Sequence, residues 1–65
     1  MAWRTAVKVH GEANYVHNAL VFATQDEAEA YGRDLRSRWT LVESFKAEET
    51  SEPVNCEFKG DLVSL

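Results

Sequence analysis

The stretch FATQDEAEAYGRDLRSRWT, residues 22–40, predicts an amphipathic helix that covers one face of a β-sheet. Thr24 is a predicted N-cap, and Glu27 stands three residues later, which is the spacing of a capping box. Acidic residues gather near the start of this stretch and arginines near its end, so both groups complement the helix dipole. We therefore expect a helix over residues 24–39.

One side of this predicted helix is apolar. At 100° per residue, five positions fall within a stripe roughly 100° wide: Ala28, Tyr31, Gly32, Leu35 and Trp39. Glycine in a helix interior costs about 1 kcal/mol relative to alanine. The position of Gly32 on the stripe therefore indicates a close approach of helix and sheet, and the stripe places Leu35 and Trp39 in the core.

Two strands are predicted before the helix. Residues 3–10, WRTAVKVH, alternate between two faces and include β-branched residues, which is typical of a half-buried strand. Residues 11–14, GEAN, are turn formers. A second strand over residues 15–22 completes a hairpin over residues 3–22. The side chains expected to point inward from it are Val16, Leu20 and Phe22.

Two further strands are predicted after the helix. In TLVESFKAEE, residues 40–49, the inward side chains are Leu41, Phe45 and Ala47, with Glu43 as an exception on that face. The break TSEP precedes VNCEFKG, residues 54–60, which predicts a short fourth strand and a hairpin over residues 40–60. Residues 61–65 form a tail that either extends this strand or frays.

The chain order ββαββ predicts an α+β fold. Because the helix returns the chain, the third strand is expected to lie beside the first. We therefore expect a single domain over residues 1–65, with one four-stranded antiparallel sheet of strand order 2-1-3-4 and one helix packed on one face. The other face is expected to be polar apart from an apolar spot of Tyr15, Ala19 and Val21, which can mark a partner surface or a homodimer contact.

The composition excludes several classes of site. Cys56 is the only cysteine, so neither an intramolecular disulfide nor a cysteine-rich zinc site is possible. No stretch resembles a signal peptide or a membrane span. We expect an intracellular protein, in the cytoplasm of a bacterial host, with no membrane partner.

The residues that chemistry would need are sparse. Cys56 has no base beside it in the sequence and is expected to be a buried thiol. His10 and His17 flank the first turn but lack a third metal ligand unless Glu12 joins them, so they are expected to be surface histidines. We therefore predict no enzyme activity, no cofactor and no metal site.

The net charge of −4 comes from the C-terminal third of the chain. Residues 1–42 hold five acidic and five basic side chains, whereas residues 43–65 hold six acidic and two basic ones. A negative patch of this kind selects a protein partner with a basic surface, although charge runs are often simply solvated. The protein-binding residues that we expect are Glu48, Glu49, Glu52 and Glu57, with Tyr15 as an apolar anchor.

An alternative function is binding of single-stranded nucleic acid. The basic residues for it are Lys8, Arg33, Arg36 and Arg38, together with an exposed aromatic ring for base stacking. This alternative is less favoured because an acidic chain is a poor general binder of phosphate backbones.

A sequence pattern runs through much of the chain. Its residues are Phe22-Ala23-Thr24, Glu27-Ala28, Tyr31, Asp34-Leu35, Arg38-Trp39-Thr40 and Pro53-Val54-Asn55. The pattern resembles a family of very small uncharacterised proteins encoded by phages and by bacterial genomes that carry prophages. The resemblance covers residues 3–55, most strongly 22–42, and it implies a fold without carrying over any catalytic residue.

The predicted arrangement is also similar to that of small phage proteins that bind and inhibit host enzymes, although a shared fold does not imply a shared function. Together, these features predict a non-catalytic, phage-type protein-binding module. We expect it to inhibit or redirect a host or defence enzyme through an acidic surface.

Overall fold

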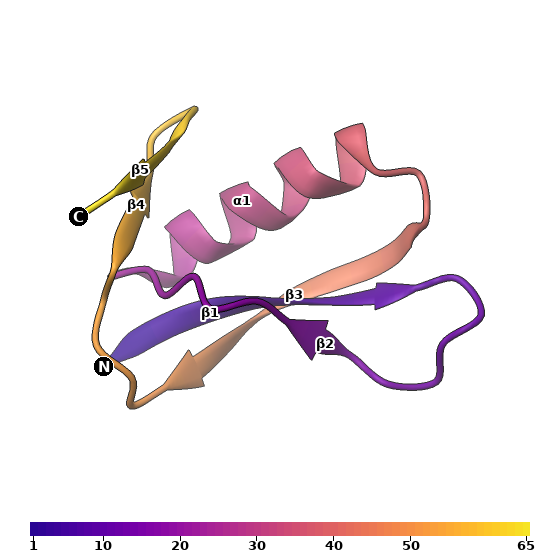
Figure 1. Ribbon diagram of the computed structural model, residues 1–65, viewed down its shortest axis with the longest axis horizontal. Coiled ribbons are helices and arrows are strands. Elements are labelled where there is room, and N and C mark those ends of the chain that lie inside the picture. The colour runs from indigo at the N-terminus through magenta and orange to yellow at the C-terminus, as the bar shows by residue number, and fades with distance from the viewer.

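The computed structural model describes residues 1–65 and contains one helix and five strands (Figure 1). Their bounds are β1 Ala2–Val9, β2 Val16–His17, α1 Gln25–Arg38, β3 Val42–Thr50, β4 Cys56–Phe58 and β5 Leu62–Ser64. An antiparallel sheet has the strand order β2-β1-β3, while β4 and β5 form a separate antiparallel hairpin. The α+β class and the order of the first three strands are confirmed. The prediction of one four-stranded sheet with order 2-1-3-4 is wrong.

The fourth strand, β4, stays out of the sheet because Asn55, the residue directly before it, is hydrogen-bonded to the segment that follows β2. Its side chain donates to Ala19 O at 2.7 Å and accepts from Val21 N–H at 2.9 Å. The backbone N–H groups of Asn55 and Cys56 also donate to Val21 O, at 3.0 and 3.3 Å. The chain then turns back on itself, and the residues predicted as a tail, 61–65, include β5.

The start of α1 follows the sequence closely. Thr24 is the N-cap, and its hydroxyl accepts from Glu27 N–H at 3.2 Å. In a standard capping box, the carboxylate at this position accepts from the backbone N–H of the N-cap residue. Here one oxygen of Glu27 accepts from the Thr24 hydroxyl at 3.1 Å, and the other accepts from Phe58 N–H at 3.0 Å. Glu27 therefore joins the first turn of the helix to β4.

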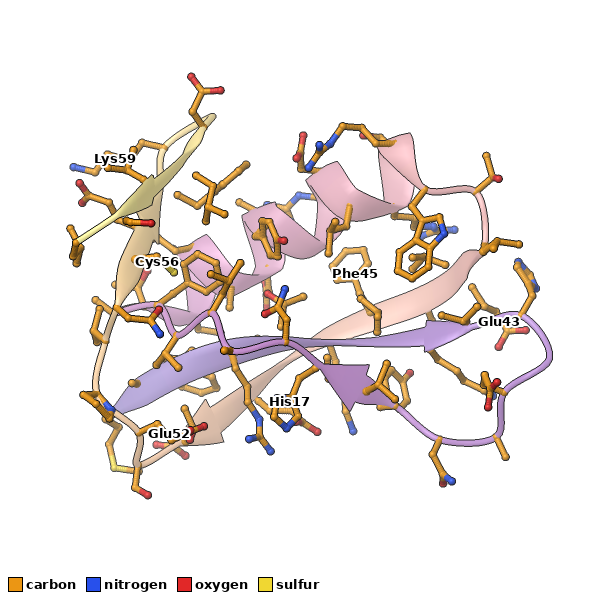
Figure 2. All side chains as sticks on the ribbon, in the orientation of Figure 1. His17, Glu43, Phe45, Glu52, Cys56 and Lys59 are labelled. Atoms are coloured by element: carbon orange, nitrogen blue, oxygen red, sulfur yellow. The ribbon has the colours of Figure 1, made fainter.

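The core lies between α1, β1 and the start of β4. Phe22, Ala28, Tyr31 and Cys56 form a buried cluster, with Trp3, Leu20 and Leu35 packed at its margin. The hydroxyl of buried Thr5 donates to Ala28 O at 2.6 Å and ties β1 to the helix. Figure 2 shows Phe45 between α1 and β3, against the helix position of Gly32, so the predicted close approach is confirmed.

The second strand and the end of the helix differ from expectation. β2 contains only Val16–His17, and the chain returns to β1 through an isolated bridge between Trp3 and Phe22. Val21, predicted on the outer face, is 3% exposed, while Val16 is 54% exposed. Trp39 is 42% exposed because it is the C-cap with an extended backbone, so its side chain leaves the helical stripe.

A register shift explains the exceptional position of Glu43. Lys8 pairs with Ser44 and Val9 with Val42, which leaves Glu43 without a partner on β1, as in a β-bulge. Glu43 turns outward and its carboxylate lies 3.3 Å from Lys8 Nζ. After the shift, Val42 is buried, whereas Leu41, predicted to point inward, is half exposed.

Candidate binding groove along the helix

A groove runs along the flank of α1 that faces β2 and the β4–β5 hairpin. It consists of two adjoining hollows that share Tyr31 and Leu35. The larger, about 550 Å³, lies between α1 and the hairpin, where Phe58 and Leu62 line it. The smaller, about 230 Å³, lies between α1 and the strands β1 and β2. We call these two hollows together the helix groove.

The walls of the helix groove expose large apolar side chains. Leu62 is 43% exposed and Trp39 42% exposed, at its two ends, and Val16 borders the smaller hollow. Exposed apolar side chains that gather in one concave surface mark an interaction site more often than ones scattered singly. The groove is therefore the region of this protein best suited to receive apolar groups of a ligand.

Tyr31 holds the floor of the groove in place. Its ring packs against Phe22 at 5.4 Å between centroids and edge-on against Phe58 at 5.7 Å. Its hydroxyl accepts a hydrogen bond from Asn18 Nδ2 at 3.4 Å. The ring thus contacts the buried core and the hairpin, while the hydroxyl reaches the segment after β2. Figure 1 shows this hairpin rising beside the first turn of α1.

The rim of the larger hollow is charged. Arg38 Nη2 lies 2.6 Å from Asp34 Oδ2, so this pair is mutually neutralised. Asp61 also lines the hollow and belongs to none of the ion pairs in the structure. The lining of this hollow carries two acidic side chains and one basic one, a formal charge of −1. Asp61 is free to attract a cation.

The sheet face turned away from α1, called the outer face, carries a connected charge network. Glu48 accepts from Arg4 Nε at 3.1 Å and lies 3.4 Å from Lys46 Nζ. Glu52 lies 3.6 Å from Arg4 Nη1. Lys46 Nζ stands 4.3 Å from the centre of the Tyr15 ring. Partial burial favours a raised pKa for Glu48, but the hydrogen bonds and positive charges of Arg4 and Lys46 outweigh it, so the pKa is lowered.

The predicted acidic surface is only partly brought together. The outer-face network joins Glu48, Glu52 and Tyr15. Glu49 follows Glu48 directly in β3 and so points to the other side of the sheet. Glu57 lies on β4 and pairs with Lys59 at 3.9 Å. Figure 2 shows Glu52 at the end of β3 and Lys59 on the hairpin, at separate places on the molecule.

The four predicted nucleic-acid-binding residues do not converge. Lys8 lies on the outer face and pairs with Glu43 at 3.3 Å. Arg38 pairs with Asp34, whereas Arg33 and Arg36 are exposed and belong to no ion pair. Arg36 and Arg38 are two residues apart on the helix, so they do not face each other. An exposed aromatic ring is nevertheless present, because Trp39 is half exposed.

Cys56 is a buried core thiol, as the sequence predicts. It is 1% exposed, and its thiol donates to Val21 O at 3.4 Å. Burial raises the pKa of this thiol above its ordinary value, and the nearby Glu27 carboxylate adds to the rise, so the thiol stays protonated at neutral pH.

No group of three or more His, Cys, Asp or Glu side chains is placed to hold a metal ion. One exposed pair of possible ligands lies close together. His10 Nδ1 lies 3.6 Å from Glu43 Oε1, and both side chains are open to solvent. His17 instead forms a 3.0 Å hydrogen bond with the neighbouring Asn18 carbonyl.

Sequence reasoning missed the hairpin wall of the groove, although a local signal was present. Phe58 and Leu62 flank the three residues Lys59-Gly60-Asp61, and Gly60 has a φ of +86°. A three-residue loop with glycine in the left-handed region is a common hairpin connection. This signal would have placed Phe58 and Leu62 opposite each other, as they are in the β4–β5 pairing.

Comparison with known proteins finds no matching family model, no matching curated protein and no matching solved structure. The helix α1, with 14 residues, is neither long nor apolar enough to cross a membrane.

Proposed function

We propose that this protein is a non-catalytic binding module that captures an apolar, positively charged segment of another protein in the helix groove. The observation that carries the proposal is that the two hollows share Tyr31 and Leu35, while exposed Leu62 lines one hollow and exposed Trp39 lines the other. Such a surface suits a short peptide segment, because apolar side chains fill the hollows and the flanking strands limit its position.

The charge of the groove indicates the chemistry of the partner. Asp61 forms no ion pair within the chain, and the whole protein carries a net charge of −4. A partner segment with lysine or arginine next to large apolar residues complements both features. The resemblance to small phage and prophage proteins supports a host or defence enzyme as that partner, which binding inhibits or redirects.

The test is selection of peptides on the immobilised protein from a random peptide library. We expect the selected peptides to combine large apolar residues with lysine or arginine, and we expect Leu62→Ser to weaken their binding by more than about tenfold, since it removes one apolar wall. Val63→Ser is the matched control, because Val63 is 47% exposed and its side chain points to the other side of β5.

A second pair of variants separates the local charge of the helix groove from the net charge of the protein. Asp61→Lys should weaken binding of the selected basic peptides, whereas Glu49→Lys makes the same charge change outside the groove lining and should leave binding nearly intact. If no peptide is selected, or if Val63→Ser weakens binding as much as Leu62→Ser, the helix groove is not the binding site.

Binding of single-stranded nucleic acid is a second proposal, and it has support from one observation. Trp39 is 42% exposed, and the exposed Arg36 precedes it by one helical turn. An aromatic ring next to arginine can stack on a base and hold the neighbouring phosphate. Titration of short labelled oligonucleotides by fluorescence anisotropy tests it. Salt-sensitive binding that Trp39→Ala abolishes supports this function, and no binding at low salt eliminates it.

A further inference from the structure

The edge of β3 that faces away from β1 is a free strand edge. β3 spans 9 residues, and β1 is its only strand neighbour. Beyond the ladder with β1, the one backbone hydrogen bond from β3 joins Val42 N–H to Trp39 O, at 3.1 Å. Val42 is also the only buried residue of the strand. Backbone N–H and C=O groups along such an edge are available to pair with another strand.

The charged side chains of β3 complement those of a second β3 in one particular register. Lys46 and Glu48 both lie on the outer face, because they stand opposite Ala6 and Arg4 of β1. Consider two β3 strands paired antiparallel about a twofold axis at Ala47. Lys46 of each copy then faces Glu48 of the other, at a separation where opposite charges attract.

The neighbouring symmetric registers are less favourable. An axis at Lys46 places two lysines opposite each other, and an axis at Glu48 places two glutamates opposite each other, so both registers are repulsive. An axis at Phe45 draws the bulged Glu43 into the new ladder, where its irregular backbone disrupts pairing. Charges on an edge strand usually prevent unselective pairing. Here the same charges favour a single arrangement.

We propose that this protein forms a homodimer by antiparallel pairing of its two β3 edges, with the twofold axis at Ala47. The pairing covers residues 44–50 of each copy and leaves the bulge at Glu43 outside. It joins the two three-stranded sheets into one continuous sheet and keeps both helices on the same face of it. This inference does not depend on the helix groove, which lies on the opposite flank of α1, toward β2 and the hairpin.

The test uses two charge-reversal variants and their mixture. In Lys46→Glu alone and in Glu48→Lys alone, both cross-strand pairs become like-charged. Each variant should therefore raise the Kd of the homodimer by more than about tenfold. When the two variants are mixed, each contact again joins opposite charges, so a heterodimer should form. Sedimentation over roughly a hundredfold range of concentration measures all three states.

Matched controls separate this contact from the effect of net charge. Lys59→Glu and Glu57→Lys make the same two charge changes on the hairpin, away from β3, and should dimerise like the unaltered protein. The unaltered protein provides a measurement that needs no variant. Backbone amides of residues 44–50 that point away from β1 should exchange with solvent more slowly as the protein is concentrated.

Three results would overturn the proposal. The first is an unaltered protein that stays monomeric over the whole concentration range, with exchange of residues 44–50 independent of concentration. The second is dimerisation that neither Lys46→Glu nor Glu48→Lys weakens. The third is a mixture of the two folded variants that does not associate. Circular dichroism of each variant establishes that it is folded before its association is measured.

Discussion

The ring of Phe45 occupies the space where any side chain at position 32 would stand. A Cβ atom built on Gly32 would lie 2.8 Å from Phe45 Cγ, closer than real Cβ atoms approach a neighbour, and 3.0 Å from Phe45 Cε2. The φ of Gly32 is not in the left-handed region. Gly32 is therefore required by packing rather than by backbone conformation, and it sets how closely α1 lies on β3.

We expect Gly32→Ala to destabilise the protein despite the better helix propensity of alanine. The propensity gain is about 1 kcal/mol, while overpacking against a ring in a packed interface costs about 1–3 kcal/mol. Because the contacted atoms include the ring carbon nearest the backbone, we expect the unfolding free energy from denaturant titration to fall by about 1 kcal/mol. In a Phe45→Ala background the same substitution should instead stabilise. A stabilising Gly32→Ala in the unaltered background would contradict this account.

Glu27→Ala should loosen the hairpin from the helix. The substitution removes the acceptor of Phe58 N–H, now at 3.0 Å, and the acceptor of the Thr24 hydroxyl. We expect the unfolding free energy to fall by about 1–2 kcal/mol and the Phe58 amide to exchange faster. Glu29→Ala is the control, because Glu29 also lies near the helix start but bonds only to Gln25, at 3.1 Å. Equal acceleration of Phe58 exchange in both variants would show that Glu27 does not hold the hairpin.

Cys56 should react slowly with thiol reagents while the protein is folded. The thiol is 1% exposed, and its raised pKa keeps it protonated. We expect alkylation by iodoacetamide at pH 7 to be at least about a hundredfold slower than in denaturant, since it requires local opening. A Cys56→Ser variant with Ala13→Cys, in the exposed first turn, supplies the rate for an accessible thiol. Equal rates for the two proteins would mean that Cys56 is not protected.

The ion pairs of Glu48 should make stability depend on pH in the acid range. The pKa of Glu48 is lowered from its ordinary value of 4.5 when the protein folds. A lowered pKa stabilises the folded protein above pH 4.5, and this contribution disappears as the pH falls through the folded-state pKa.

Glu48→Gln should therefore cost a few tenths to about 1 kcal/mol at neutral pH, and the difference from the unaltered protein should shrink toward acid pH. Unfolding titrations between about pH 7 and about pH 3 measure this. Glu49→Gln is the control, because Glu49 belongs to no ion pair. A difference that stays constant with pH would contradict the role of these ion pairs.

Local sequence signals were sufficient for the elements whose stability is local. The N-cap at Thr24 and the charges at both ends of α1 predicted the helix to within one residue at either end. Period-two alternation located β1 and most of β3. The buried state of Cys56 and the packing role of Gly32 also followed, because the alternation and the helical period each assign a side chain to one face.

The candidate site was less predictable from sequence. The helical period assigns Tyr31 and Leu35 to the buried stripe, but nothing in that period shows that one flank of the stripe remains uncovered. The same period assigns Trp39 to the core, but it no longer applies where the backbone becomes extended at the C-cap. Nearness in sequence groups the acidic residues, whereas strand alternation places Glu48 and Glu49 on opposite sides of the sheet. Glu48 and Glu57 also pair with different cations, Arg4 and Lys59.

The sequence by itself determined the helix, the first and third strands and the side chains that each presents, because hydrogen bonding and periodicity within a segment require no distant partner. Only the tertiary structure decided where the last strands go and which surfaces stay open. Asn55 bonds to Ala19 and Val21, far away in the chain, and the register shift at Glu43 depends on pairing with β1. Such contacts join residues far apart in the chain, so they depend on how the whole fold packs. They create both the helix groove and the free edge of β3.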